Sequence, residues 1–104
     1  MISQTYYLIR TKRDGQYLVA RPQVEGAENP SNNGFLLIFK EQFDALSYLN
    51  THGSGVASQF AVESVSGIHL EPLLKRWGFQ GVGIVEDPLL PRIEFMLRQR
   101  GFNL

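Results

Sequence analysis

The chain has 104 residues, ten basic and ten acidic side chains, 43% hydrophobic residues and no cysteine. This length predicts a single domain over residues 1–104 with one buried core, and the apolar content excludes intrinsic disorder. The absence of cysteine excludes thiol nucleophiles, disulfides and thiolate metal sites. Because the longest apolar run is residues 35–39 and no charged-then-apolar leader starts the sequence, we expect a cytoplasmic protein without a membrane span.

The first predicted elements are two strands joined by a tight turn. Residues 5–11 and 16–21 are rich in β-branched and aromatic side chains. Asp14 and Gly15 between them favour the positive φ angles that a hairpin turn needs. We therefore expect a β-hairpin at the start of the chain.

A polar segment and a strongly apolar one follow the hairpin. Residues 22–33 contain two prolines and three asparagines with few apolar residues, which predicts a mobile surface loop. Residues 34–39 are apolar on both alternating faces, as in a strand that is buried between two layers. We expect this strand at the centre of the sheet.

Residues 41–50 predict a helix. Its apolar face is expected to contain Phe43, Leu46 and Leu49, which are spaced three residues apart, and acidic side chains stand near its start. Residues 59–65 have the length and composition of a fourth strand.

The clearest helical pattern lies in the second half of the chain. Apolar residues recur there at the i, i+3, i+4, i+7 spacing of one helix face: Leu70, Leu73, Leu74 and Trp77. Pro72 fits the first turn of this helix, and Gly78 fits the position after its last residue. Residues 82–86 then predict a fifth strand.

The segment 91–100 fits two structures. Ile93, Phe95 and Leu97 alternate as in a strand, whereas Pro91 and Gly101 are suited to the two ends of a helix. The residue types favour a helix. The predicted order is β-β-β-α-β-α-β-α, an α+β fold with a five-stranded, mixed, mainly antiparallel sheet and two to three helices on one face.

No pattern predicts catalysis or a bound metal. The sequence lacks the Gly-x-Ser-x-Gly of a nucleophile elbow, and the His69-x-Glu71 pair lacks the cysteines that accompany it in zinc deaminases. His52 and His69 do not have the spacing of a metal-binding pair. We expect no catalytic residue, no metal and no cofactor.

Binding residues are predicted on the hairpin. Tyr6, Tyr17, Arg10 and Arg21 are expected to share one face, either as aromatic and cationic groups for a ligand or as a partly covered sheet face with solvated arginine tips. The balanced net charge argues against tight binding to nucleic acid. Trp77 fits either the core or an interface anchor.

A second set of binding residues is predicted at the C-terminal end. The tail 101–104 carries Phe102 and Leu104 beyond the expected helix, with Arg98 and Arg100 before it. These apolar side chains either fold back on their own domain or dock on a groove or sheet edge of another protein.

The segment 39–49, a strand ending in Phe39 and a helix with an acidic start and an Ala45-Leu46 centre, resembles the SseB-like family of small α+β domains. The stretch from Leu73-Leu74 to the glycine-turned strand at 81–84 is similar to the same family. The resemblance covers residues 35–85, and Glu86-Asp87-Pro88 departs from the family's Asn-Pro step. The layout is also similar to that of small uncharacterised proteins of photosynthetic bacteria, some of which act as assembly factors.

The resemblance implies a non-enzymatic adaptor or assembly role and transfers no catalytic residue. Together with the absence of a catalytic pattern, the apolar residues on both faces of the hairpin sheet and the apolar tail, it leads us to expect a protein–protein interaction module. This would be an adaptor or assembly chaperone, with another protein or a second copy as partner. The alternative hypothesis is a regulatory domain that binds a small molecule or single-stranded nucleic acid through the hairpin.

Overall fold

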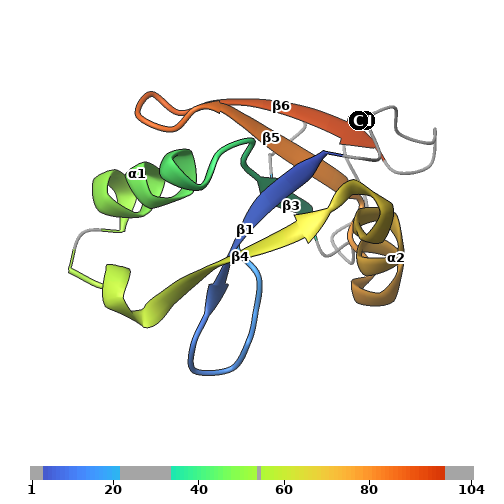
Figure 1. The fold of residues 1–104 in the computed structure, drawn as a ribbon, viewed down its shortest axis with the longest axis horizontal. Helices are drawn as coiled ribbons and strands as arrows, with labels where there is room; N and C mark the ends of the chain where they lie inside the picture. Colours follow the sequence, from blue (N-terminus) through green and yellow to red (C-terminus); the bar gives the residue numbers. More distant parts are fainter. Residues whose placement is uncertain (1–3, 22–33, 54, 98–104) are drawn as a thin grey trace.

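A computed structural model describes residues 4–21, 34–53 and 55–97. These residues form a mixed α+β fold with two helices and six strands (Figure 1). In chain order the elements are β1 (Thr5–Thr11), β2 (Val19–Ala20), β3 (Phe35–Ile38), α1 (Gln42–His52), the 3₁₀ turn η1 (Ala57–Gln59), β4 (Phe60–Ser66), α2 (Gly67–Trp77), β5 (Gly81–Asp87) and β6 (Arg92–Leu97). The expected loop 22–33 and tail 101–104 lie outside the described residues.

The strands form two hydrogen-bonded groups instead of the expected single five-stranded sheet. One group is the antiparallel pair β1-β4, and the other has the order β2-β3-β5-β6. Only the β3–β5 pairing is parallel, so the sheet is mixed and mainly antiparallel as predicted. The two groups are joined at the edge of β1 that faces away from β4. There Tyr7 and Phe39 exchange two backbone hydrogen bonds of 2.9 Å.

The N-terminal hairpin forms, but its second strand is short. The Leu18 N–H donates to the Ile9 carbonyl at 2.8 Å, and the backbones of Arg10 and Tyr17 form an isolated antiparallel β-bridge. After Leu18 the chain leaves β1 and pairs with β3 as β2. The full-length antiparallel partner of β1 is therefore β4, which lies much later in the sequence.

Strand β3 is buried on both faces, as its apolar pattern predicted. Leu36 and Ile38 belong to one core together with Leu70, Leu73 and Leu74 of α2. The alternating residues Leu37 and Phe39 belong to a second core together with Ala45 and Leu49 of α1. Because successive side chains of a strand point to opposite faces, the two helices cover opposite sides of the sheet. The expectation that the helices share one face was wrong (Figure 1).

Helix α1 uses a different face from the one predicted. Phe43 is 75% exposed and Leu46 is 45% exposed, so of the three predicted residues only Leu49 is buried. The small side chain of Ala45 and the ring of Tyr48, whose centroid lies 5.5 Å from that of Phe39, complete the buried face. The prediction assigned the large apolar side chains to the buried face, but the helix packs on the sheet through the small Ala45.

Helix α2 follows the predicted pattern closely. Leu70, Leu73 and Leu74 are buried, but the helix begins at Gly67, so Pro72 lies in its second turn. Gly78 has a φ of 73° and ends the helix in the left-handed conformation that favours glycine. The Phe79 N–H donates to the Leu74 carbonyl at 2.9 Å, and this reversal directs Phe79 into the core.

Residues 92–97 form strand β6, so the predicted helix over 91–100 was wrong. The strand pairs antiparallel with β5, so that Gly81 lies opposite Leu97 at one end and Asp87 lies opposite Arg92 at the other. The register shifts between Val85 and Asp87. The Asp87 carboxylate accepts the N–H groups of Leu89 and Leu90 at 2.9 and 3.3 Å and fixes the connecting turn. Hydrogen bonding to the β5 edge outweighs helix propensity, because a short isolated helix is marginal in water.

Substitution of Gly81 tests the β5–β6 pairing. A Cβ atom on Gly81 would lie 1.9 Å from the Met96 carbonyl oxygen, whereas one on Gly83 would meet only side chains, at 3.0 Å and beyond. We expect Gly81→Ala to lower the free energy of unfolding by about 3 kcal/mol and Gly83→Ala by about 1 kcal/mol. Chemical denaturation of both variants measures this difference. Equal and small losses would argue against the pairing.

Candidate binding groove

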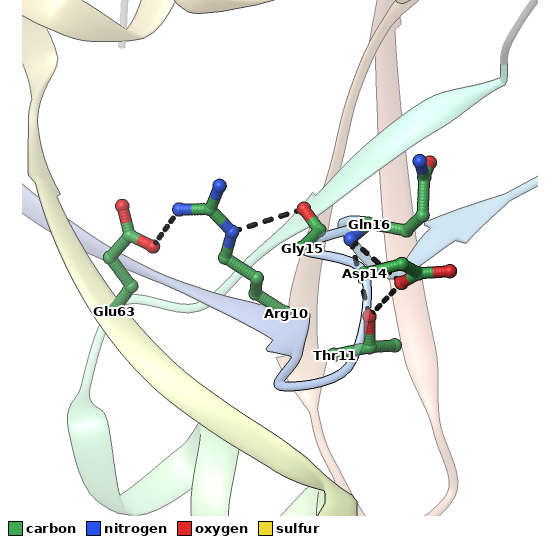
Figure 2. A network of polar contacts seen from close by, with 6 residues as sticks. All are labelled: Arg10, Thr11, Asp14, Gly15, Gln16 and Glu63. Carbon is green, nitrogen blue, oxygen red and sulfur yellow. Dashed lines mark hydrogen bonds and ion pairs between the residues drawn. The ribbon is translucent and has the colours of Figure 1, made fainter.

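The turn of the N-terminal hairpin is held by a compact set of polar contacts (Figure 2). Gly15 has a φ of 72°, and its N–H donates to the Thr11 carbonyl at 3.1 Å. The Asp14 carboxylate accepts the Thr11 hydroxyl and the Gln16 N–H. These hydrogen bonds, that from Thr11 first, lower the pKa of Asp14 below its ordinary value. The turn thus fixes where the chain enters the segment that carries Tyr17.

Arg10 connects this turn to β4 and to Tyr17. Its Nη1 lies 2.9 Å from Glu63 Oε1, and its Nε donates to the Gly15 carbonyl at 3.0 Å (Figure 2). Its Cζ also lies 4.8 Å from the centroid of the Tyr17 ring. The hydrogen bond with Glu63 raises the pKa of Arg10. Because the ion pair is partly exposed, it contributes little to the free energy of folding. Its effect is to hold Arg10 over the ring of Tyr17.

Three aromatic rings meet beside Arg10. The Tyr17 ring stands edge-on to Trp77 with 4.9 Å between centroids, and Trp77 lies nearly parallel to Phe79 at 5.9 Å. Phe79 is buried, whereas Tyr17 and Trp77 are half-buried. At the reversal after α2, Phe79 belongs to the core, and Trp77 packs against the same core while its side chain stays half-buried beside Tyr17.

These rings line a groove of about 340 Å³, which we call the aromatic groove. Its walls come from the hairpin and from the end of α2: Gln16, Tyr17, Val19, Arg21, Trp77 and Phe79. The volume is at the lower end of the range for ligand sites. The lining combines aromatic rings with the polar side chains of Gln16 and Arg21.

The charges around the aromatic groove act on Tyr17. Burial is the main cause that raises the pKa of this phenol, and Glu63 raises it further, whereas Arg10 and Arg76 oppose the shift. The phenol therefore remains neutral at physiological pH. The phenol is hydrogen-bonded to Glu63, and the exposed Arg21 adds a cation to the lining of the groove.

The structure brings three of the predicted hairpin residues together at this place. Tyr17 and Arg21 line the aromatic groove, and Arg10 lies over the Tyr17 ring. Tyr6 belongs to the core on the same face, but it is only 2% exposed, and its hydroxyl donates to Gln4 Oε1 at 3.2 Å. Tyr6 is therefore a core residue and not an exposed aromatic platform.

The other predicted binding residues were Phe102, Leu104, Arg98 and Arg100, all of which lie outside the described residues. The sequence left two hypotheses for Trp77, a core residue or an interface anchor. In the structure its side chain is half-buried beside Tyr17. Sequence reasoning did not connect the hairpin to the end of α2. The adjacent Trp77-Gly78-Phe79 was the available signal, because the glycine ends the helix between two aromatic residues whose rings then stack at 5.9 Å.

Both histidines and Glu86 have local structural partners. The Ser66 hydroxyl and His69 Nδ1 lie 2.9 Å apart at the start of α2, and His52 Nε2 lies 2.8 Å from the Pro88 carbonyl oxygen. Glu86 pairs with Lys40 at 3.5 Å. Within residues 4–21, 34–53 and 55–97, no three histidine or acidic side chains are grouped so that they could hold a metal ion.

In the same described ranges, neither helix has the length and apolar character needed to cross a bilayer. The chain matches no protein-family model, no curated protein and no solved structure. The resemblance to SseB-like domains therefore stays a prediction, and the functional argument rests on the aromatic groove.

Trp77 is the single tryptophan of the chain and reports on the groove directly. We expect Tyr17→Ala to increase quenching of Trp77 fluorescence by acrylamide, because the ring that covers one side of the indole is removed. Tyr48→Ala is the matched control, since it removes a half-buried tyrosine from the core on the other side of the sheet. Similar quenching in both variants would contradict the described contact.

Proposed function

We propose that the protein is a non-enzymatic protein–protein interaction module, an adaptor or assembly factor acting in the cytoplasm, and that the aromatic groove binds a segment of its partner. The supporting observation is the group formed by Tyr17, Trp77 and Arg21 at one open groove. Tyrosine, tryptophan and arginine are the residues that contribute most often to binding energy at protein interfaces.

The way the groove is held supports a binding role as well. Arg10 and the hairpin turn fix Tyr17 from one side, and the end of α2 fixes Trp77 from the other. Binding to a site that is already ordered requires little further loss of side-chain freedom, and this preserves affinity. Grooves lined by aromatic rings also suit extended segments rich in proline or aliphatic residues.

Single-stranded nucleic acid is the alternative ligand class. Its bases stack on aromatic rings and its phosphates pair with arginine, and the groove offers both groups in Trp77 and Arg21. The charge balance of ten basic and ten acidic residues favours a protein ligand instead.

The proposal is tested by affinity capture from the lysate of the source cells with the full chain as bait. We expect a partner that is held by the wild-type protein and by Tyr48→Ala. Trp77→Ala should bind it about thirtyfold more weakly, since loss of a hot-spot tryptophan costs about 2 kcal/mol. Arg21→Glu should weaken capture without disturbing the core, because Arg21 is exposed.

Circular dichroism verifies that each variant is folded, and overlapping peptides of the captured partner locate the bound segment through the emission of Trp77. Capture that is equal for the wild type, Trp77→Ala and Arg21→Glu would rule out the groove as the binding site. Salt-dependent binding of oligonucleotides that is lost in the same variants would favour the alternative ligand class.

A further inference from the structure

The charges near the aromatic groove are unevenly matched. Two carboxylates of the hairpin and the neighbouring β4 already have partners, because Glu63 pairs with Arg10 and Asp14 accepts the hydrogen bonds of the turn. Arg21 differs from Arg10, since it lines the groove, is exposed, and belongs to neither ion pair found among the described residues. The groove therefore has a cation that the described part of the chain does not neutralise.

The stem of Arg21 is fixed against the start of β3. A Cβ atom on Gly34, whose φ is 89°, would lie 3.0 Å from Arg21 Cγ, so the stem packs on the bare backbone of this glycine. The Gly34 carbonyl accepts the Gln80 N–H at 2.8 Å, which ties the same point to the residue after Phe79. Arg21 is thus anchored at its base beside the groove, although the residue as a whole is exposed.

The end of α2 adds positive charge. Its last turn carries Lys75 and Arg76 and no acidic residue. Burial raises the pKa of Tyr17, and the charge of Arg76 is close enough to act against this shift. Basic residues are usual at a helix C-terminus, where they offset the helix dipole. Arg21 has no such role, since it follows β2 and belongs to no helix, so it is the cation that points most directly to an anionic ligand.

The rings give the apolar part of the groove the shape of a corner. Tyr17 meets Trp77 at an interplanar angle of 75°, and Phe79 lies within 12° of parallel to the indole. Because the half-buried indole contacts both rings, it offers less than the full open face on which a nucleic-acid base stacks. A corner suits a compact ring such as proline, and aromatic grooves bind proline in extended segments.

We propose that the segment bound by the aromatic groove is acidic and extended, with a proline in the corner between Tyr17 and Trp77 and a neighbouring carboxylate paired with Arg21. This inference rests on the proposed function and specifies the chemistry of the partner. A carboxylate matches the planar guanidinium and can form two parallel hydrogen bonds with it. A groove of about 340 Å³ holds a short segment, so recognition depends on this local combination of ring and charge.

An unbiased peptide selection tests the proposal. A library of random peptides displayed on phage is first depleted on Trp77→Ala and then selected on the wild-type protein, so that the recovered sequences depend on the groove. We expect these sequences to be enriched in proline with aspartate or glutamate beside it. Recovery of basic or uncharged sequences would overturn the acidic segment, and so would a selection that recovers no sequence above background.

A titration isolates the contribution of charge. A selected peptide and a copy with glutamine in place of its acidic residues are each titrated against the emission of Trp77. We expect the acidic peptide to bind about fivefold more tightly, a difference within reach of exposed ion pairs, and this preference to disappear in Arg21→Gln. Arg92→Gln is the matched control, since Arg92 is an exposed arginine on β6, at the other end of the order β2-β3-β5-β6. An acidic preference that survives Arg21→Gln, or is lost equally in Arg92→Gln, would contradict the pairing with Arg21.

Capture of the partner separates this inference from the proposed function. If Trp77→Ala and Arg21→Glu leave capture unchanged, the groove does not bind the partner and both proposals fail. If both variants lose capture but the bound segment of the partner is neutral or basic, only the acidic segment is overturned. An oligothymidylate that displaces the selected peptide and binds more tightly would assign Arg21 to phosphate and also overturn it. Circular dichroism verifies that each variant keeps its fold.

Discussion

Burial of β3 on both faces is the constraint on which the rest of the structure depends. A strand of four buried residues has no solvent-facing side, so each face needs its own cover. Leu36 and Ile38 take the α2 side, and Leu37 takes the α1 side. Since the pairing with β5 is parallel, the chain must cross over between these strands, and both helices lie in that crossover. The opposite placement of α1 and α2 follows from this arrangement.

The aromatic groove is a consequence of the core on the α2 side. Tyr17 and Trp77 both pack against that core but are incompletely covered by it. Two local features determine their positions. One is the Asp14–Gly15 turn with Arg10 over the Tyr17 ring, and the other is the left-handed Gly78 that ends α2 between Trp77 and Phe79. Neither feature contributes a large part of the folding free energy, since the Arg10 ion pair is partly exposed. Their effect is to fix the positions of Tyr17 and Trp77 in the aromatic groove.

Local sequence signals predicted most of the elements but not their arrangement. The ranges of β1, β4, β5 and α2 were close to those observed, because each is specified by its own turn residues and apolar periodicity. The prediction failed at β6, where antiparallel hydrogen bonding to the preceding strand β5 outweighs the residue types that favoured a helix. It also failed for the buried face of α1, where the small Ala45 permits the close approach to the sheet. The α1 error concerns packing between elements, which a pattern within one segment does not contain. At β6 the segment carried both a strand and a helix pattern, and pairing with β5 decided between them.

The candidate site was predictable to the same extent. The alternation of the hairpin placed Arg10, Tyr17 and Arg21 on a common face, and the structure has them together. Their approach to Trp77 depends on how α2 lies against β3, which is a tertiary property. The burial of Tyr6 has the same origin, because α2 and β5 cover that end of the hairpin face.

The most direct test of the account is a set of proton–proton Overhauser contacts in the free protein. The account predicts contacts from the Leu36 and Ile38 methyl groups to the leucines of α2, from the Leu37 methyl groups to Leu49 of α1, and from the Trp77 indole to the Tyr17 ring. Contacts of Leu36 and Leu37 to the same helix, or an indole without contact to Tyr17, would contradict the division of the core by β3 and the groove that depends on it.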